Sequence, residues 1–135
     1  MSAGLALQKA VYELLMASDA LKATVGNPVR LYDQVPAEPI FPYITFGDAQ
    51  ELEDEADCID GTEHFLDLHV WSQARGRVEA KAISGVVREE LRGTALTLDG
   101  HAFCLSEVES TRHLKDPDGA TAHSILTFRV LTEAE

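Results

Sequence analysis

The feature that most constrains this chain is a cluster of three prolines directly before a run of aromatic and β-branched residues. Pro36, Pro39 and Pro42 precede residues 43–48, whose sequence is YITFGD. A proline fixes φ and lacks an N–H, and it biases the residue before it towards extended geometry. The proline segment therefore cannot become a helix, and it delivers the residues after it to a sheet as an extended strand.

Hydrophobic periodicity predicts two helices and one well-marked strand elsewhere. Residues 62–72 alternate between apolar and other side chains, which predicts a strand buried on one face. Residues 3–18 carry apolar side chains at helical spacing, and so do the residues that follow Ser72 as far as Leu91. Ser72 is the expected N-cap of this second helix, and Gly93 is expected to end it.

The remaining segments predict short strands joined by tight turns. Further strands are expected at residues 29–35, 43–48, 95–98, 102–111 and 121–132. Asp-Pro-Asp-Gly at 116–119 is a strong turn signal between the last two. Few parallel crossovers are possible in this order, so we expect a single α+β domain over residues 1–135. Its architecture should be a largely antiparallel β-sheet with two main helices packed on one face.

Charge is distributed unevenly along the chain. The formal net charge is −12, and no Lys or Arg occurs between Arg30 and Arg75. General affinity for nucleic acid needs a basic face, so this balance excludes it. We expect residues 49–61 to form an acidic loop closed by an Asp-Gly turn. The plainer interpretation is a solvated loop kept polar for solubility, and the sharper one is a surface that repels another polyanion.

The side chains capable of chemistry form no catalytic or metal-binding pattern. His64 and His69 lie on one expected strand at an odd spacing, so they face opposite sides of the sheet. Asp67 shares a face with His69, but no Ser or Cys is placed to act as nucleophile beside them. Phosphate-binding, dinucleotide-binding, zinc-protease and EF-hand motifs are absent. We therefore expect no enzyme activity, no cofactor and no bound metal.

The N-terminal segment and the apolar runs bear on where the protein works. The first twenty residues lack the basic start of a signal peptide, and no apolar run approaches the length of a membrane span. We expect a protein that is made and used in the cytoplasm, with no membrane partner.

Four stretches of sequence follow one another in a recognisable order. They are LYDQVPAEPIFPYITFGD at residues 31–48, HFLDLHVWSQARGRVEAKAISGVVREEL at 64–91, LTLDGH at 96–101 and DGATAHSILTFRVLTE at 118–133. In order and spacing, the chain resembles the tail-terminator, or tail-completion, family of long-tailed phages, prophages and gene transfer agents. The resemblance covers nearly the whole chain, which departs from the family in being unusually acidic after Gly47.

The resemblance implies an assembly role and no reaction. Members of the family form a hexameric ring on the head-proximal end of the tail tube, where the ring stops tube polymerisation and offers the head a joining surface. The implied partners are the chain itself as a homohexamer, a tail tube protein and a head-completion or stopper (connector) protein. DNA would cross the ring without specific binding. The protein would act in the host cytoplasm during assembly and remain in the tail of the particle.

The acidic segment has an expected role in such a ring. A conduit for DNA must not hold the duplex, and carboxylates keep phosphates off its wall. The candidate channel or docking loop consists of Glu51, Glu53, Asp54, Glu55 and Asp57. In the docking alternative, the same loop reaches the tube or the connector. The sequence also leaves open a different class of protein, a small cytoplasmic enzyme or ligand-binding domain of unknown specificity.

Overall fold

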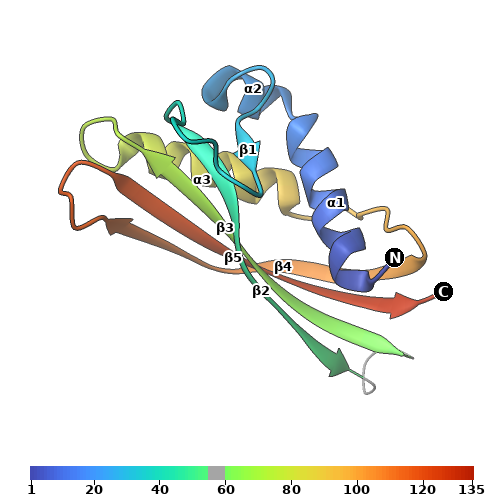
Figure 1. Ribbon diagram of the computed structural model, residues 1–135. Helices are drawn as coiled ribbons and strands as arrows, with labels where there is room; N and C mark the ends of the chain where they lie inside the picture. The colour runs from blue at the N-terminus through green and yellow to red at the C-terminus, as the bar shows by residue number, and fades with distance from the viewer. Residues whose placement is uncertain (55–59) are drawn as a thin grey trace.

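One sheet organises the computed structural model, which describes residues 1–54 and 60–135. The elements are α1 (Ala3–Met16), α2 (Asp19–Val25), β1 (Leu31–Tyr32), β2 (Tyr43–Asp54), β3 (Gly61–Ser72), α3 (Val78–Leu91), β4 (His101–Lys115) and β5 (Ala122–Ala134). Within the described residues the strands form a five-stranded sheet in the order β1-β2-β3-β5-β4. Only the β1–β2 pair is parallel there. The helices lie on one side of the sheet (Figure 1), which confirms the expected α+β fold.

The hydrophobic core lies between that side of the sheet and the helices. β3 and β5 pair in antiparallel register and contribute alternate side chains to the core. These inward side chains are Leu66, Leu68, Val70, Leu126, Phe128 and Val130. They share one cluster with apolar residues of α1 and α3, such as Val11 and Val87. Full burial of a side chain of this size contributes about 1.5–3 kcal/mol, so this face holds the fold together.

The second long helix begins later than the sequence predicts. β3 continues through Ser72, which pairs with Ala122, and α3 starts only at Val78. Ser72 is therefore not the N-cap. Its hydroxyl accepts a hydrogen bond from the Ala74 N–H at 3.1 Å and donates one to the Glu79 carboxylate at 2.8 Å. The expected capping residue instead ties the end of β3 to the first turn of α3.

The acidic segment differs most from its prediction. Residues 49–54 continue β2 and pair with β3, from Ala49 opposite Leu66 to Asp54 opposite Gly61. The expected loop is therefore wrong for these residues, because pairing with a strand that is anchored in the core outweighs the low strand propensity of Glu and Asp. A register shift between Phe46 and Ala49 separates them from the start of β2. Of the predicted candidates, Glu55 and Asp57 lie outside the described residues.

The C-terminal half is a long hairpin of β4 and β5. The strand expected at 95–98 does not form, and this segment contributes only an isolated bridge to the start of β4. The predicted turn at 116–119 is confirmed. Asp118 organises it by accepting hydrogen bonds from the N–H groups of Ala120 and Thr121, at 2.8 and 2.9 Å. These bonds hold the pKa of the Asp118 carboxyl below its ordinary value.

Candidate assembly surfaces

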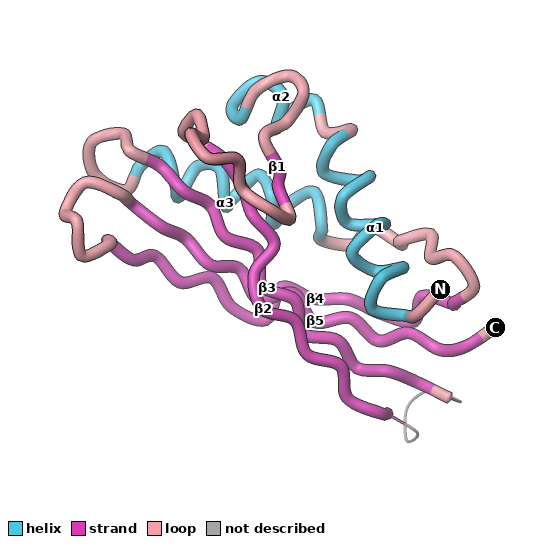
Figure 2. The backbone as a smooth tube through the Cα atoms, viewed as in Figure 1, coloured by secondary structure: helices cyan, strands magenta, loops and turns pink. Residues whose placement is uncertain are grey.

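The far halves of β2 and β3, residues 48–54 and 61–66, form the acidic arm of the sheet, which extends past the start of α1 (Figure 2). Residues 61–66 also pair with β5, so the outer edge of this arm is β2. Residues 48–53 are all exposed. The structure thus brings the predicted residues Glu51, Glu53 and Asp54 together on one strand. Side chains alternate along a strand, so the first two share a face and Asp54 points to the other. They do not form the single-sided cluster that a loop would allow.

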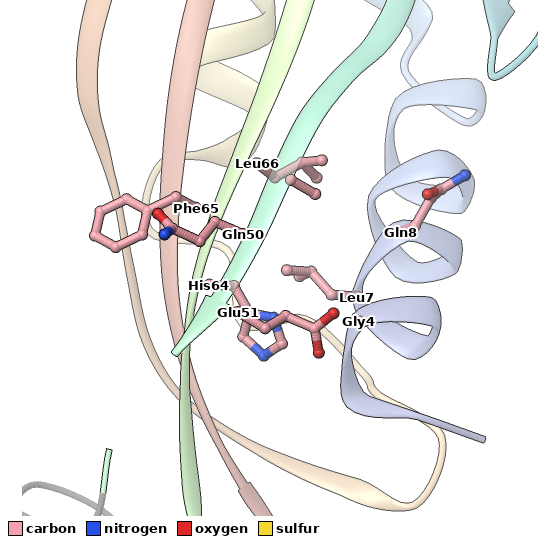
Figure 3. A pocket seen from close by; sticks show the side chains of 9 residues that line it. Gly4, Leu7, Gln8, Gln50, Glu51, His64, Phe65 and Leu66 are labelled. Atoms are coloured by element: carbon pink, nitrogen blue, oxygen red, sulfur yellow. The ribbon is translucent and has the colours of Figure 1, made fainter. Parts of the chain in front are cut away.

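Glu51 turns towards α1 (Figure 3). A Cβ atom added at Gly4 would overlap the Glu51 carboxylate, so the carboxylate lies directly against the first turn of this helix. α1 has no acidic residue of its own in that turn. A negative charge there interacts favourably with the helix dipole. Glu51 therefore contributes to the fold as well as to the acidic surface, a contact that sequence reasoning missed.

His64 lies opposite Glu51 in the antiparallel register and is buried. Its Nε2 atom is 3.0 Å from the Thr132 hydroxyl oxygen of β5. Burial lowers the pKa of His64 below its ordinary value of 6.5, and the charge of Glu51 partly opposes this shift. The adjoining cavity measures about 130 Å³, whereas pockets for drug-sized ligands usually measure about 300–1,000 Å³. This site stabilises the fold and does not resemble a substrate pocket.

The sheet face opposite the helices carries a stack of aromatic and imidazole rings. Trp71 stacks on His123 with 3.7 Å between ring centroids, and its Nε1–H donates to the Thr45 hydroxyl at 3.0 Å. His69 Nδ1 lies 2.6 Å from His123 Nε2, and His123 Nδ1 lies 3.5 Å from an Asp116 carboxylate oxygen. Burial lowers the pKa of both imidazoles. Trp71 thus packs on this open face.

The histidine predictions have mixed outcomes. His64 and His69 face opposite sides of the sheet, as expected. A four-residue turn at 116–119 predicts that His113 pairs with Ala122. This register is wrong, since His113 pairs with Ser124. The cause is a longer turn, because β4 ends at Lys115 and β5 begins seven residues later. The described residues contain no group of three His, Cys, Asp or Glu side chains placed to hold a metal ion. None of their helices is long and apolar enough to cross a membrane.

A basic groove runs between α3 and the outer strand β4. Two adjoining hollows of about 310 and 230 Å³ share Arg88 as a lining residue. Their charged or titratable lining residues are Lys81, Arg88, Arg92, Glu107 and His113. Burial and the nearby charges of Lys81 and Arg77 lower the pKa of His113. Sequence reasoning missed this surface, although seven of the eleven Lys and Arg residues lie between residues 75 and 115.

Comparison with known proteins matches this geometry to a family. Residues 9–133 match the family model described as "Tail completion protein gp17". The chain belongs to this family. The tail completion protein gp17 of Bacillus phage SPP1 is 30% identical over 124 residues, which cover 92% of this chain and 90% of that protein. Its solved structure has a TM-score of 0.64 and 29% identity, and the match covers 95% of this chain and 89% of that one.

A second solved structure matches the tail completion fold more fully. It is a chain from the virion of a native gene transfer agent particle, with a TM-score of 0.86, 28% identity and coverage of 98% of both chains. Both relatives are structural proteins of particles and not enzymes, in agreement with the sequence prediction. Membership of the tail completion family thus assigns a structural role in tail assembly and sets aside the enzyme alternative.

Proposed function

We propose that this protein forms a ring at the head-proximal end of a tail tube, stops tube polymerisation and provides the surface that joins tail to head. The observation that carries the proposal is the similarity to a gene transfer agent virion chain over 98% of both chains, with a TM-score of 0.86. Tail completion by the folded domain itself is the role that this match supports.

The two edges of the sheet support a closed assembly. β1 pairs only with Ile44 and Thr45, so the outer edge of β2 beyond Thr45 carries no partner strand within the described residues. β4 forms the opposite edge and pairs there only with β5. Exposed edges invite open-ended association, and a closed ring of identical subunits removes this hazard. We propose a homohexamer, the ring size implied by the family resemblance.

The partners follow from the position of such a ring. It contacts the tail tube protein on one side and the head-completion or connector protein on the other, and DNA passes through its centre. A net charge of −12 favours passage without binding. Assembly takes place in the host cytoplasm, and the protein then stays in the tail of the particle. The acidic segment around Glu51, Glu53 and Asp54 lines the channel or docks on a neighbouring protein.

Deletion of the gene from a particle-producing strain tests the proposal. We expect tubes of uncontrolled length and heads without tails, because nothing caps the tube or offers a joining surface. Expression of the wild-type chain from a plasmid should restore joined particles of uniform tail length. Electron micrographs of the lysates measure both quantities. Joined tails of normal length after deletion would overturn the proposal.

A further inference from the structure

Opposite charges lie along opposite edges of the sheet. The outer edge of β2 carries the exposed acidic residues Asp48, Glu51 and Glu53, whereas the basic groove follows β4 at the other edge. Among the groove residues, Glu107 is the one carboxylate that the described lining contains, and Arg129 binds it at 3.3 Å. The groove therefore keeps a net positive lining at neutral pH.

Both edges offer a regular length of strand beside these charges. β4 has register shifts at Phe103/Leu105 and Val108/Ser110, and from Ser110 to Lys115 it runs regularly along β5. β2 has a shift at Phe46/Ala49 and then runs regularly along β3 through Asp54. Bulges discourage edge-to-edge pairing where they occur. The two bulge-free stretches are the places where a further chain can approach each edge closely.

The spacing of the charges on the two edges also agrees. From Lys81 to Arg92, eleven residues of helix rise about 16 Å. From Asp48 to Glu53, five residues of strand extend about 17 Å. Lys81, Arg88 and Arg92 lie along a single groove, so its cations span the same length as the carboxylates of the β2 edge. Glu51 is turned towards its own α1, so Asp48 and Glu53, at the two ends of this length, are the carboxylates left to meet the groove cations of a second copy.

We propose that the α3–β4 groove of one copy receives the acidic outer edge of β2 from a second copy of this chain. The two surfaces lie on opposite edges of the sheet. Each copy can therefore place its β2 edge in the groove of one neighbour and receive the β2 edge of another neighbour in its own groove. Such a head-to-tail contact repeats from copy to copy and closes into a ring when the rotation allows. The inference rests on the ring proposed above, and it assigns the acidic segment to contact between subunits and not to the channel wall.

A charge exchange between the two surfaces tests this contact. The groove variant carries Lys81→Glu and Arg92→Glu, and the edge variant carries Asp48→Lys and Glu53→Lys, so that both changed pairs have the same spacing. Each should reduce the number of joined particles about tenfold or more in the deletion strain, because like charges then face each other across the contact. A chain with all four substitutions should restore most joined particles, since its reversed groove again meets an oppositely charged edge. Glu51 is left unchanged because it contacts α1.

Matched controls separate the contact from a general effect of charge. Lys9→Glu with Lys22→Glu, and Glu13→Lys with Asp19→Lys, change the net charge equally at positions of α1 and α2, away from both edges. These controls should keep joined particles near the wild-type number. Thermal unfolding of each purified variant shows that it folds. The proposal is overturned if the single-surface variants join particles normally, or if the four-fold variant joins no more than they do.

The same strain keeps this inference distinct from the proposed function. If deletion abolishes joining but the charge exchange does not restore it, the ring function stands and this contact is wrong. A groove that binds the tube or connector protein gives that result, because reversing the β2 edge cannot repair it. If deletion leaves joining and tail length normal, the proposed function itself fails.

Discussion

The two halves of β2 belong to one strand but differ in almost every physical respect. All four residues from Tyr43 to Phe46 are buried, whereas residues 48–53 are all exposed. The first half has the helices on one face and the stacked rings of the open face on the other. The second half contacts α1 mainly through Glu51. A single strand can therefore hold the core at one end and present an assembly surface at the other.

The position between the halves has no room for a side chain unless a neighbouring side chain moves. A Cβ atom at Gly47 would overlap the imidazole of His69 and lie 3.2 Å from the Cβ of Asp67. The register shift of β2 falls at this point, so the strand changes its course where the next strand approaches closely. Irregular geometry at Gly47 thus separates the part of β2 that stabilises the fold from the part available to partners.

The largest expected contrast between the halves is in stability. Ile44 is 0% exposed and Leu52 is 42% exposed on the same strand. Ile44→Ala should lower the free energy of unfolding by about 2–5 kcal/mol, because it removes buried methyl groups and leaves a cavity. Leu52→Ala should change it by about 0.5 kcal/mol or less. Urea unfolding of both variants measures the difference, and similar losses would contradict a division of the strand into two roles.

A smaller effect is expected at the junction. Gly47→Ala should lower the free energy of unfolding by about 1–3 kcal/mol, because the added methyl group must displace His69. Gly85→Ala in α3 is the matched control, since a Cβ there meets no other atom within 4 Å. That change should stabilise the protein by about 0.5–1 kcal/mol, the usual gain for Gly to Ala inside a helix. A Gly47→Ala variant as stable as the wild type would show that the close approach of His69 to Gly47 does not restrict this position.

Buried imidazoles on β3 and β5 predict a free energy of unfolding that depends on pH. Burial lowers the pKa of His64 beside the arm and of His123 in the ring stack below 6.5. As pH falls through 6.5, the unfolded chain takes up protons that the folded protein binds only at lower pH, so stability decreases on acidification. Urea unfolding at pH 7.5 and 5.5 should show this decrease. His64→Asn and His123→Asn should each make this decrease smaller. If a variant loses as much stability on acidification as the wild type, the replaced histidine does not contribute to the pH dependence.

The smallest expected effect lies within the arm itself. Glu51→Gln removes a charge beside the start of α1 and should cost about 0.3–1 kcal/mol. Glu53→Gln removes the same charge two residues further along, away from the helix, and should leave stability nearly unchanged. Thermal unfolding of both variants should be compared at low ionic strength, because salt screens the interaction between the charge and the helix dipole. Equal effects would show that the contact with α1 contributes nothing.

Much of the fold could be predicted because its signals are local. The alternation around Leu66, Leu68 and Val70 places β3 correctly, with the same residues buried. The proline segment predicts an extended entry into β2, which begins at Tyr43 directly after Pro42. The turn at 116–119 follows from residues that favour turns by their own hydrogen bonds.

The remaining features depend on contacts between distant parts of the chain. Residues 49–54 have few apolar side chains, and only pairing with β3 makes them a strand. Ser72 looks like a helix cap, yet its pairing with Ala122 extends β3 and delays α3. The candidate assembly surfaces could be predicted only in part, because some of their contacts also join distant parts of the chain. Sequence identified Glu51 and Glu53 as an acidic surface, but the proximity of Glu51 to Gly4 and the groove beside Arg88 exist only in the folded chain.

The location of the protein on the tail tests the proposed terminating ring most directly. Purified protein that carries a gold-labelled affinity tag can be mixed with tail tubes from the deletion strain and imaged by electron microscopy. A terminating ring predicts label at one end of each tube, with no further growth at the labelled end when free tube subunits are added. Label along the length of the tubes, or at both ends equally, would contradict it.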